Sequence, residues 1–271
     1  MSVGDFLRES VFIYSANEDV STSQYLFNFA RANVGYQNIT LGSGFSFFTP
    51  TFKAVAGGAI DIQNIKCLQT DGSEWKTSGK GATKCAGDVS VQKVDTTGRF
   101  GTVYSYYSTL TPVGWYSDNG ATYAEGISFA DGEGMIVQNT HTVGASFQVS
   151  GEVNLNPGIV LANGFSFCGN FTPVTINIQD FACVQIDGSD WKTSGKGATK
   201  CAGDVSLQKV DSTGRFGTVY SYYSTLTPAG WYSDNGTVYA EGVTFTAGEG
   251  FIVQNTHSVG AKLLPKAPVV Q

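Results

Sequence analysis

Apolar and polar residues alternate over short stretches of this chain, and each stretch ends at turn-forming residues. Residues 90–95 and 102–107 alternate around a turn at 96–98, a pattern that predicts a β-hairpin. The tripeptide Asp-Asn-Gly at 118–120 and again at 234–236 is a strong signal for a tight turn. No amphipathic period of helical length occurs between these turns, so the pattern predicts an all-β fold.

The sequence contains an internal duplication. A shift of 116 residues matches 71–145 with 187–261, with only about a dozen differences over 75 positions. Upstream, LGSGFSFF at 41–48 matches LANGFSFC at 161–168. We therefore predict two tandem β-sandwich or jelly-roll-like modules. The expected division is an N-terminal arm at 1–32, β-module 1 at 33–150, β-module 2 at 151–261 and a C-terminal tail at 262–271.

Charge and hydropathy exclude several classes of partner. Only 14% of residues are charged and the formal net charge is −6. A nucleic-acid binder needs clustered basic residues, so we expect no nucleic-acid partner. No run of about eighteen apolar residues occurs, so we expect no membrane insertion. Asp5, Arg8 and Glu9 interrupt the apolar stretch that a secretory signal would need, so we expect no signal peptide.

The two ends lie outside the duplication. The arm is too short and too apolar to bury its own side chains, so we expect it to contact a partner surface. Pro265 and Pro268 cannot donate ladder hydrogen bonds, so the tail is expected at a sheet edge or extended. The apolar residues of this assembly arm are Phe6, Leu7, Val11, Phe12, Ile13 and Tyr14.

Four of the five cysteines repeat with the modules. Cys67 and Cys85 are eighteen apart, as are Cys183 and Cys201, whereas Cys168 replaces Phe48 of the first copy. One interpretation is a disulfide within each module, and the other is buried thiols. Neither paired CxxC spacing nor neighbouring histidines are present, so we expect no metal site and no cofactor.

Several polar residues that could act as catalytic groups occur in both copies. His141 and His257 are repeat equivalents with no recognisable nucleophile, so they are expected in turns. The repeated carboxylates adjoin Gly or Asn, where turn hydrogen bonding explains them. Replacement of Glu74 by Asp190 also argues against two identical catalytic sites. We therefore expect no enzyme activity; the carboxylates concerned are Asp71, Glu74, Asp118, Glu125 and Glu133.

Repeated aromatic residues are the best candidates for ligand binding. If they are exposed on loops, these aromatic rings could stack on sugar rings. The alternative is that they fill the core and its rim, which Gly-Trp-Tyr beside a hairpin favours. The candidates are Trp75, Trp115, Tyr116, Trp191, Trp231 and Tyr232.

The motifs GFSF, QKVD, GRFGTVYSYY, GWYSDNG and GEG[MF]IVQN, followed by SGEV at 150–153, resemble uncharacterised tandem β-modules of phage structural and bacterial cell-surface proteins. The resemblance covers 33–261 and implies a building or decorating role. Because we expect no signal peptide, a virion is favoured over a secreted surface location, and we expect a non-catalytic structural protein of a virion, as a capsid decoration or tail protein. Its expected partners are further copies of itself or other structural subunits. The alternative is a carbohydrate-binding or adhesive protein of the bacterial cell surface or the extracellular space, with surface glycans as partners.

Overall fold

The computed structural model describes residues 34–54, 58–76, 88–95, 97, 99–141, 144–154, 158–191, 204–211, 213–257 and 260–265. The arm at 1–32 lies outside these residues, as does the tail beyond Pro265. Every long element in the described part of the chain is a β-strand, and the only helical elements there are four short 3-10 turns. The expected all-β fold is confirmed.

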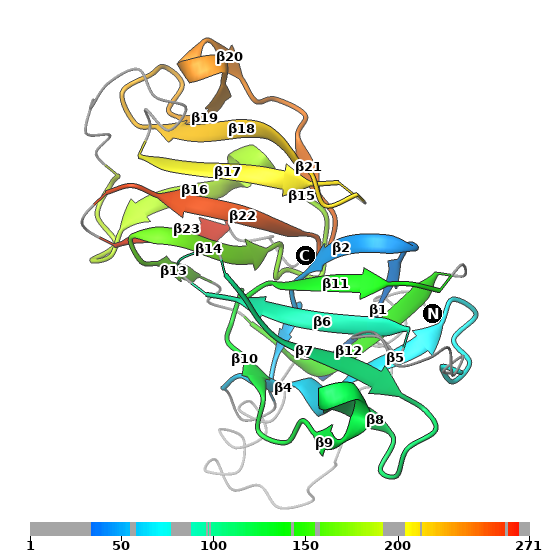
Figure 1. The fold of residues 1–271 in the computed structure, drawn as a ribbon. Coiled ribbons are helices and arrows are strands. Elements are labelled where there is room, and N and C mark those ends of the chain that lie inside the picture. Colours follow the sequence, from blue (N-terminus) through cyan, green and yellow to red (C-terminus); the bar gives the residue numbers. More distant parts are fainter. Residues whose placement is uncertain are drawn as a thin grey trace, which may run out of the picture.

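The first module consists of two antiparallel sheets and a small two-stranded ladder (Figure 1). Six strands form the larger sheet in the order β2-β11-β6-β7-β8-β9. In the second sheet, β12 pairs with β1 on one side and with β5 and β3 on the other. The bounds are β1 Val34–Leu41, β2 Gly44–Phe48, β3 Phe52–Lys53, β4 Ile60–Asp61, β5 Ile65–Gln69, β6 Val89–Val94, β7 Phe100–Tyr107, β8 Gly114–Ser117, β9 Thr122–Tyr123, β10 Ser128–Phe129, β11 Met135–Asn139 and β12 Ala145–Val153.

The second module repeats this architecture. Its larger sheet has the order β14-β22-β17-β18-β19-β20, and its second sheet has the order β13-β23-β16. The strand order therefore matches that of the first module, as the duplication predicts. The bounds are β13 Ile159–Leu161, β14 Gly164–Gly169, β15 Ile176–Asn177, β16 Phe181–Gln185, β17 Val205–Val210, β18 Phe216–Tyr223, β19 Gly230–Ser233, β20 Val238–Tyr239, β21 Thr244–Phe245, β22 Gly250–Asn255 and β23 Ala261–Pro265.

The two turns predicted from sequence are present. Strands β6 and β7 form the expected hairpin, and the Asp95 carboxylate accepts hydrogen bonds from the backbone N–H groups of Thr97 (2.8 Å) and Arg99 (2.9 Å). The Asp-Asn-Gly turn joins β8 to β9, with Asn119 in the left-handed region at φ 58°. Asparagine tolerates this conformation better than most residues, which explains the signal in the sequence.

Each module has its own hydrophobic core between its two sheets. Trp115 of β8 is fully buried, and its indole Nε1–H donates a 2.7 Å hydrogen bond to the Ile65 carbonyl of the opposite sheet. Trp231 and Phe181 repeat this bond at the same length. A buried indole N–H needs an acceptor, so this bond fixes the two sheets of each sandwich against each other.

The last strand of each module lies inside its sheet. Strand β23 pairs with both β13 and β16, so the residues from Lys262 to Pro265 belong to the second module and not to an edge or tail. Pro265 is tolerated because it is the last residue of the strand. Strand β12 runs to Val153, past the expected module boundary at 150.

Candidate interaction surface

The six aromatic residues considered as candidates for ligand binding are all buried. Their side chains are at most 7% exposed, and Trp115 and Trp231 are completely enclosed. A ring can stack on a sugar only through an exposed face, so these rings are not available for stacking in this conformation. The structure places them in the core and its rim, which is the alternative that the sequence favoured.

The histidines and tyrosines near these rings have packing roles. His141 lies edge-on to Trp75 with the ring centroids 5.5 Å apart, and His257 and Trp191 repeat the contact at 5.3 Å. The Tyr116 hydroxyl donates to the carbonyl of Pro112 at 2.6 Å. These contacts give the repeated aromatic residues a structural explanation in both modules.

Three cysteines are described, and all three are buried thiols. Burial raises the pKa of Cys67, Cys168 and Cys183 well above the usual thiol range, because the thiolate would lose its hydration. Cys85 and Cys201, the expected disulfide partners, lie outside the described residues. The two disulfides therefore stay predictions.

The repeated carboxylates make structural contacts. Glu133 accepts a hydrogen bond from the backbone N–H of Ala130 at 2.9 Å and pairs with Lys93 at 2.9 Å. Its equivalent Glu249 pairs with Lys209 at 2.8 Å. Asp71 accepts from the backbone N–H of Ser73, and hydrogen bonds from the side chain and the backbone of Ser73 lower its pKa. Turn hydrogen bonding thus accounts for Asp71 and Glu133, as their glycine neighbours suggested.

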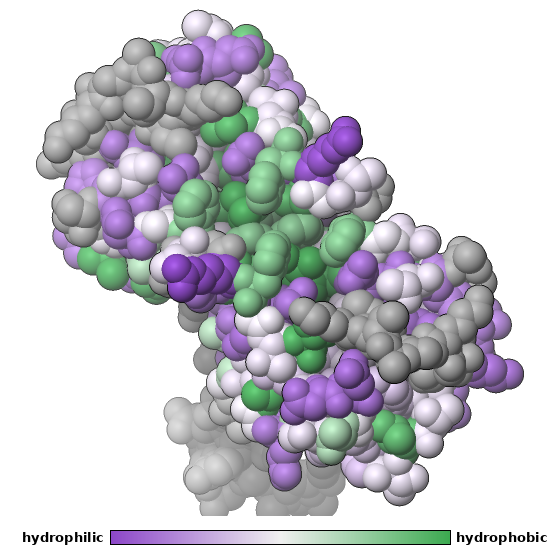
Figure 2. Space-filling view, viewed as in Figure 1, coloured by the Kyte–Doolittle hydropathy of each residue, from purple (hydrophilic) through white to green (hydrophobic). Residues whose placement is uncertain are grey.

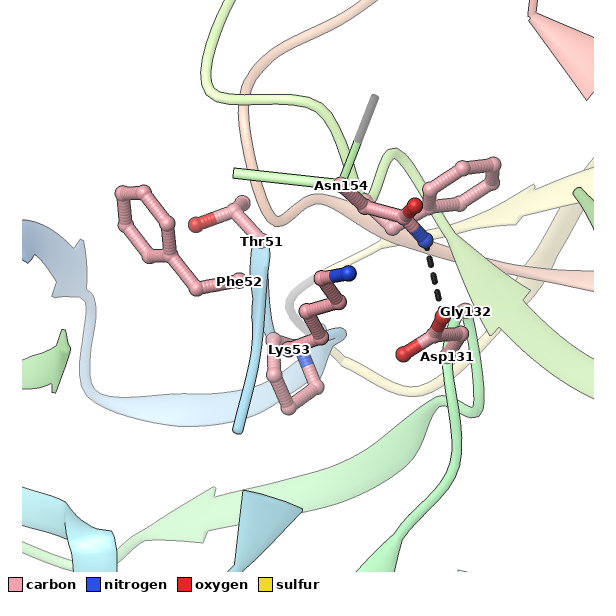
Figure 3. A pocket seen from close by; sticks show the side chains of 8 residues that line it. Thr51, Phe52, Lys53, Asp131, Gly132 and Asn154 are labelled. Atoms are coloured by element: carbon pink, nitrogen blue, oxygen red, sulfur yellow. Dashed lines mark hydrogen bonds between the residues drawn. The ribbon is translucent and has the colours of Figure 1, made fainter. Parts of the chain in front are cut away.

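One small depression with a mixed polar and apolar lining lies beside the junction of the modules (Figure 3). It contains about 180 Å³ of space, part of it open to solvent, between the β3 segment of the first module and Phe171 of the second. Among its lining residues, the Asn154 side-chain amide donates to the Asp131 carboxylate at 2.7 Å. Partial burial raises the pKa of Asp131, although Lys53 and the bond from Asn154 oppose the rise.

The second copy does not repeat the charged residue that lines this depression, because Ala247 replaces Asp131 there. Sequence reasoning missed the site, although the replacement of a charged residue by alanine inside a nearly identical repeat was a visible signal. The space is too small for a drug-sized ligand, so we assign it no binding role.

The two modules contact each other reciprocally. Phe48 forms a β-bridge with Glu249, and Cys168, at the position equivalent to Phe48, forms a bridge with Glu133, the equivalent of Glu249. Phe47 and its own equivalent Phe167 stack with ring centroids 5.6 Å apart. When a residue contacts its own equivalent in the other module, the two modules are related by an approximate two-fold axis. The junction is therefore isologous, like that of a symmetric homodimer.

At this junction the backbones of the two modules are in direct contact. The backbone N–H of Gly134 donates to the Phe167 carbonyl at 2.7 Å, and that of Thr49 donates to the Gly248 carbonyl at 3.0 Å. A Cβ atom placed on Gly250 would lie 2.7 Å from the Phe47 backbone carbon. The two sandwiches are thus not independent, although each has its own core.

Strand registers define an outward row of side chains on each six-stranded sheet. In the first module, Ile136 lies opposite both Phe47 and Gln92, and Gln92 lies opposite Val103. Residues opposite each other point to the same side of a sheet. The inward face carries the core, so this row faces outward. The same registers also place the buried serines Ser90, Ser105, Ser206 and Ser221 in this row. We call the outer face the following part of the row: Phe45, Phe47, Gln92, Val94, Phe100, Val103, Ile136 and Gln138, with Phe165, Phe167, Gln208, Val210, Phe216, Val219, Ile252 and Gln254.

Twelve of the sixteen outer-face residues are Phe, Val or Ile and four are Gln, and the apolar ones continue across the junction. Ile136, Phe167 and Ile252 form one cluster with Phe47 and Val94 packed against it. Figure 2 shows apolar side chains running from one module into the other on the side of the larger sheets. Phe100 and Phe216 are 64% and 56% exposed at its two ends. In a strand with one solvated face, the side chains that point to the solvent are ordinarily polar, so the apolar residues on this face are unusual.

Further features bear on function. No group of three or more His, Cys, Asp or Glu placed to hold a metal ion occurs within the described ranges. In the same part of the chain, no helix is long and apolar enough to cross a membrane. Comparison of the chain with protein-family models, curated proteins and solved structures gave no match.

Proposed function

We propose that this chain is a non-catalytic structural subunit of a larger assembly, specifically a virion component such as a capsid decoration or tail protein. The isologous junction carries the structural part of this proposal. It holds two nearly identical modules in one orientation, so one chain presents two copies of the same surface at a fixed spacing. Such a chain can bridge two equivalent sites of a lattice.

The resemblance of the repeated motifs to modules of phage structural proteins supports a virion, and the same resemblance includes proteins of the bacterial cell surface. Burial of the six aromatic residues that would stack on sugars favours the structural role over the adhesive one.

The location of the protein tests this proposal. We expect quantitative mass spectrometry of purified particles to find the chain in a constant ratio to the major particle protein. The control is the surface fraction of the producing cells, prepared in parallel. Enrichment in that fraction, with none in particles, would contradict the virion assignment.

We further propose that the arm at 1–32 links the subunit to the particle, because its apolar residues need a partner surface. Deletion of residues 1–20 should abolish incorporation into particles while the melting temperature stays unchanged. The proposal fails if the shortened chain still enters particles, or if the deletion lowers the melting temperature strongly and leaves association intact.

A further inference from the structure

We propose that the outer face binds the outer face of a second copy of this chain, so that two chains pair face to face. This inference deepens the proposed structural role by naming a partner and rests on that role. Its test needs only purified protein, so its failure can be distinguished from failure of the virion assignment.

The first argument is continuity with the junction inside the chain. Phe47 and Phe167 stack where the modules meet, and Ile136 and Ile252 pack beside them. The apolar contact that joins the two modules continues outward as exposed surface, because Phe45, Phe100 and Phe216 of the same face are exposed. Hydrophilic side chains border this apolar band (Figure 2), as a polar rim borders the apolar centre of an interface. The apolar surface therefore extends past the contact between the modules.

The second argument is charge. The whole chain has a formal net charge of −6, yet none of the sixteen outer-face residues is charged. Two identical surfaces repel each other when like charges meet across them, and a neutral face avoids this cost. A strongly basic or acidic partner would find no complementary charge on this face. The chemistry therefore fits an apolar, uncharged surface, and a second copy supplies one.

The third argument is symmetry. The outer face already consists of two equivalent halves related by the two-fold junction. A two-fold pairing of two chains is a closed arrangement, and each contact made by one module is repeated by the other. Aromatic residues suit the centre of such an interface because they bury a large area with few rotatable bonds. Phe100 and Phe216, the most exposed members, would become buried by the partner.

Charged substitutions at these two residues test the pairing. Sedimentation velocity over a range of concentrations should show wild type with the mass of two chains. The double variant Phe100→Asp, Phe216→Asp should raise the dissociation constant about 100-fold or more, because two charges would be buried without partners. Both side chains are largely exposed, so the melting temperature of the separated chain should stay unchanged.

A matched control is available on the other surfaces of the molecule. Val160 and Ile186 are 60% and 47% exposed and lie outside the outer face. The double variant Val160→Asp, Ile186→Asp adds the same charge and should keep the mass of two chains.

Three outcomes would overturn the inference. Wild type could sediment as one chain even at about 100 µM, a concentration at which an interface of this kind should form. The pair could persist unchanged in the Phe100→Asp, Phe216→Asp variant. Finally, wild type could be a single chain whose melting temperature falls with these substitutions, which would assign the face to the arm at 1–32 of the same chain.

Discussion

Two glycines at equivalent positions allow the backbones of the two modules to touch. A Cβ atom on Gly250 would lie 2.7 Å from the Phe47 backbone carbon, and one on Gly134 would lie 2.9 Å from the Cys168 nitrogen. Neither glycine needs a positive φ, so the restriction comes from the neighbouring module and not from backbone strain. The close contact between the modules therefore requires glycine, which has no Cβ atom, at both positions.

We predict that Gly250→Ala lowers the free energy of unfolding by about 1–3 kcal/mol, the usual cost of overpacking a close contact. Urea denaturation measures the loss. Gly42→Ala is the matched control, because a Cβ there meets nothing within 4 Å. Equal stability of the two variants would show that the backbone contact between modules does not form in solution.

Asp131 gives a prediction about pH. Burial raises its pKa, so its charged form is less favourable in the folded chain than in the unfolded chain. The cost is present above the folded-state pKa and disappears below the unfolded value of about 3.9. Asp131→Asn should therefore raise the melting temperature near neutral pH, and the gain should vanish as the pH falls toward about 3. A gain that persists at low pH would exclude this cause.

At the scale of elements, the last strand of each module holds its smaller sheet together. Strand β12 lies between β1 and β5, and β23 lies between β13 and β16. Removing an edge strand exposes one row of backbone groups, but removing a central strand leaves two strands without a partner.

A chain that ends at residue 260, without β23, should therefore lose the fold of its second module, while a chain that ends at Pro265 should keep it. Proteolysis followed by mass spectrometry would show whether residues 158–260 are degraded while the first module is protected. A protease-resistant second module in the shorter chain would contradict the role of β23.

Local elements were predictable because their signals are local. The β6–β7 hairpin and the Asp-Asn-Gly turn depend on residues next to each other in sequence. The pairing of β12 with β1 joins residues more than 100 positions apart, such as Tyr36 and Ser150, and no local pattern encodes it. The sequence favoured burial of Trp75 and Trp115 without establishing it, because an aromatic residue beside a turn suits either a core or a binding loop.

At the scale of the whole molecule, duplication was evident but the junction was not. The match between the two copies predicted their equal strand order, since nearly identical sequences fold alike. The sequence GFSF reads as an ordinary alternating strand, and nothing in it indicates that Phe47 would stack on Phe167. The depression at Asp131 and the outer face both depend on this junction, so sequence alone could not locate them.

The central position of β12 and β23 also has a consequence for the order in which the chain is made. Both strands begin at an alanine that lies opposite a glutamine, Ala145 opposite Gln69 and Ala261 opposite Gln185, so the two strands enter equivalent places in the same register. During synthesis, β12 leaves the ribosome long before β23 exists, and the first module can close with its own strand. Refolding from denaturant offers both strands at once. We therefore expect refolded protein to contain strand-exchanged molecules, measurable as a smaller native melting transition than in protein purified without denaturation.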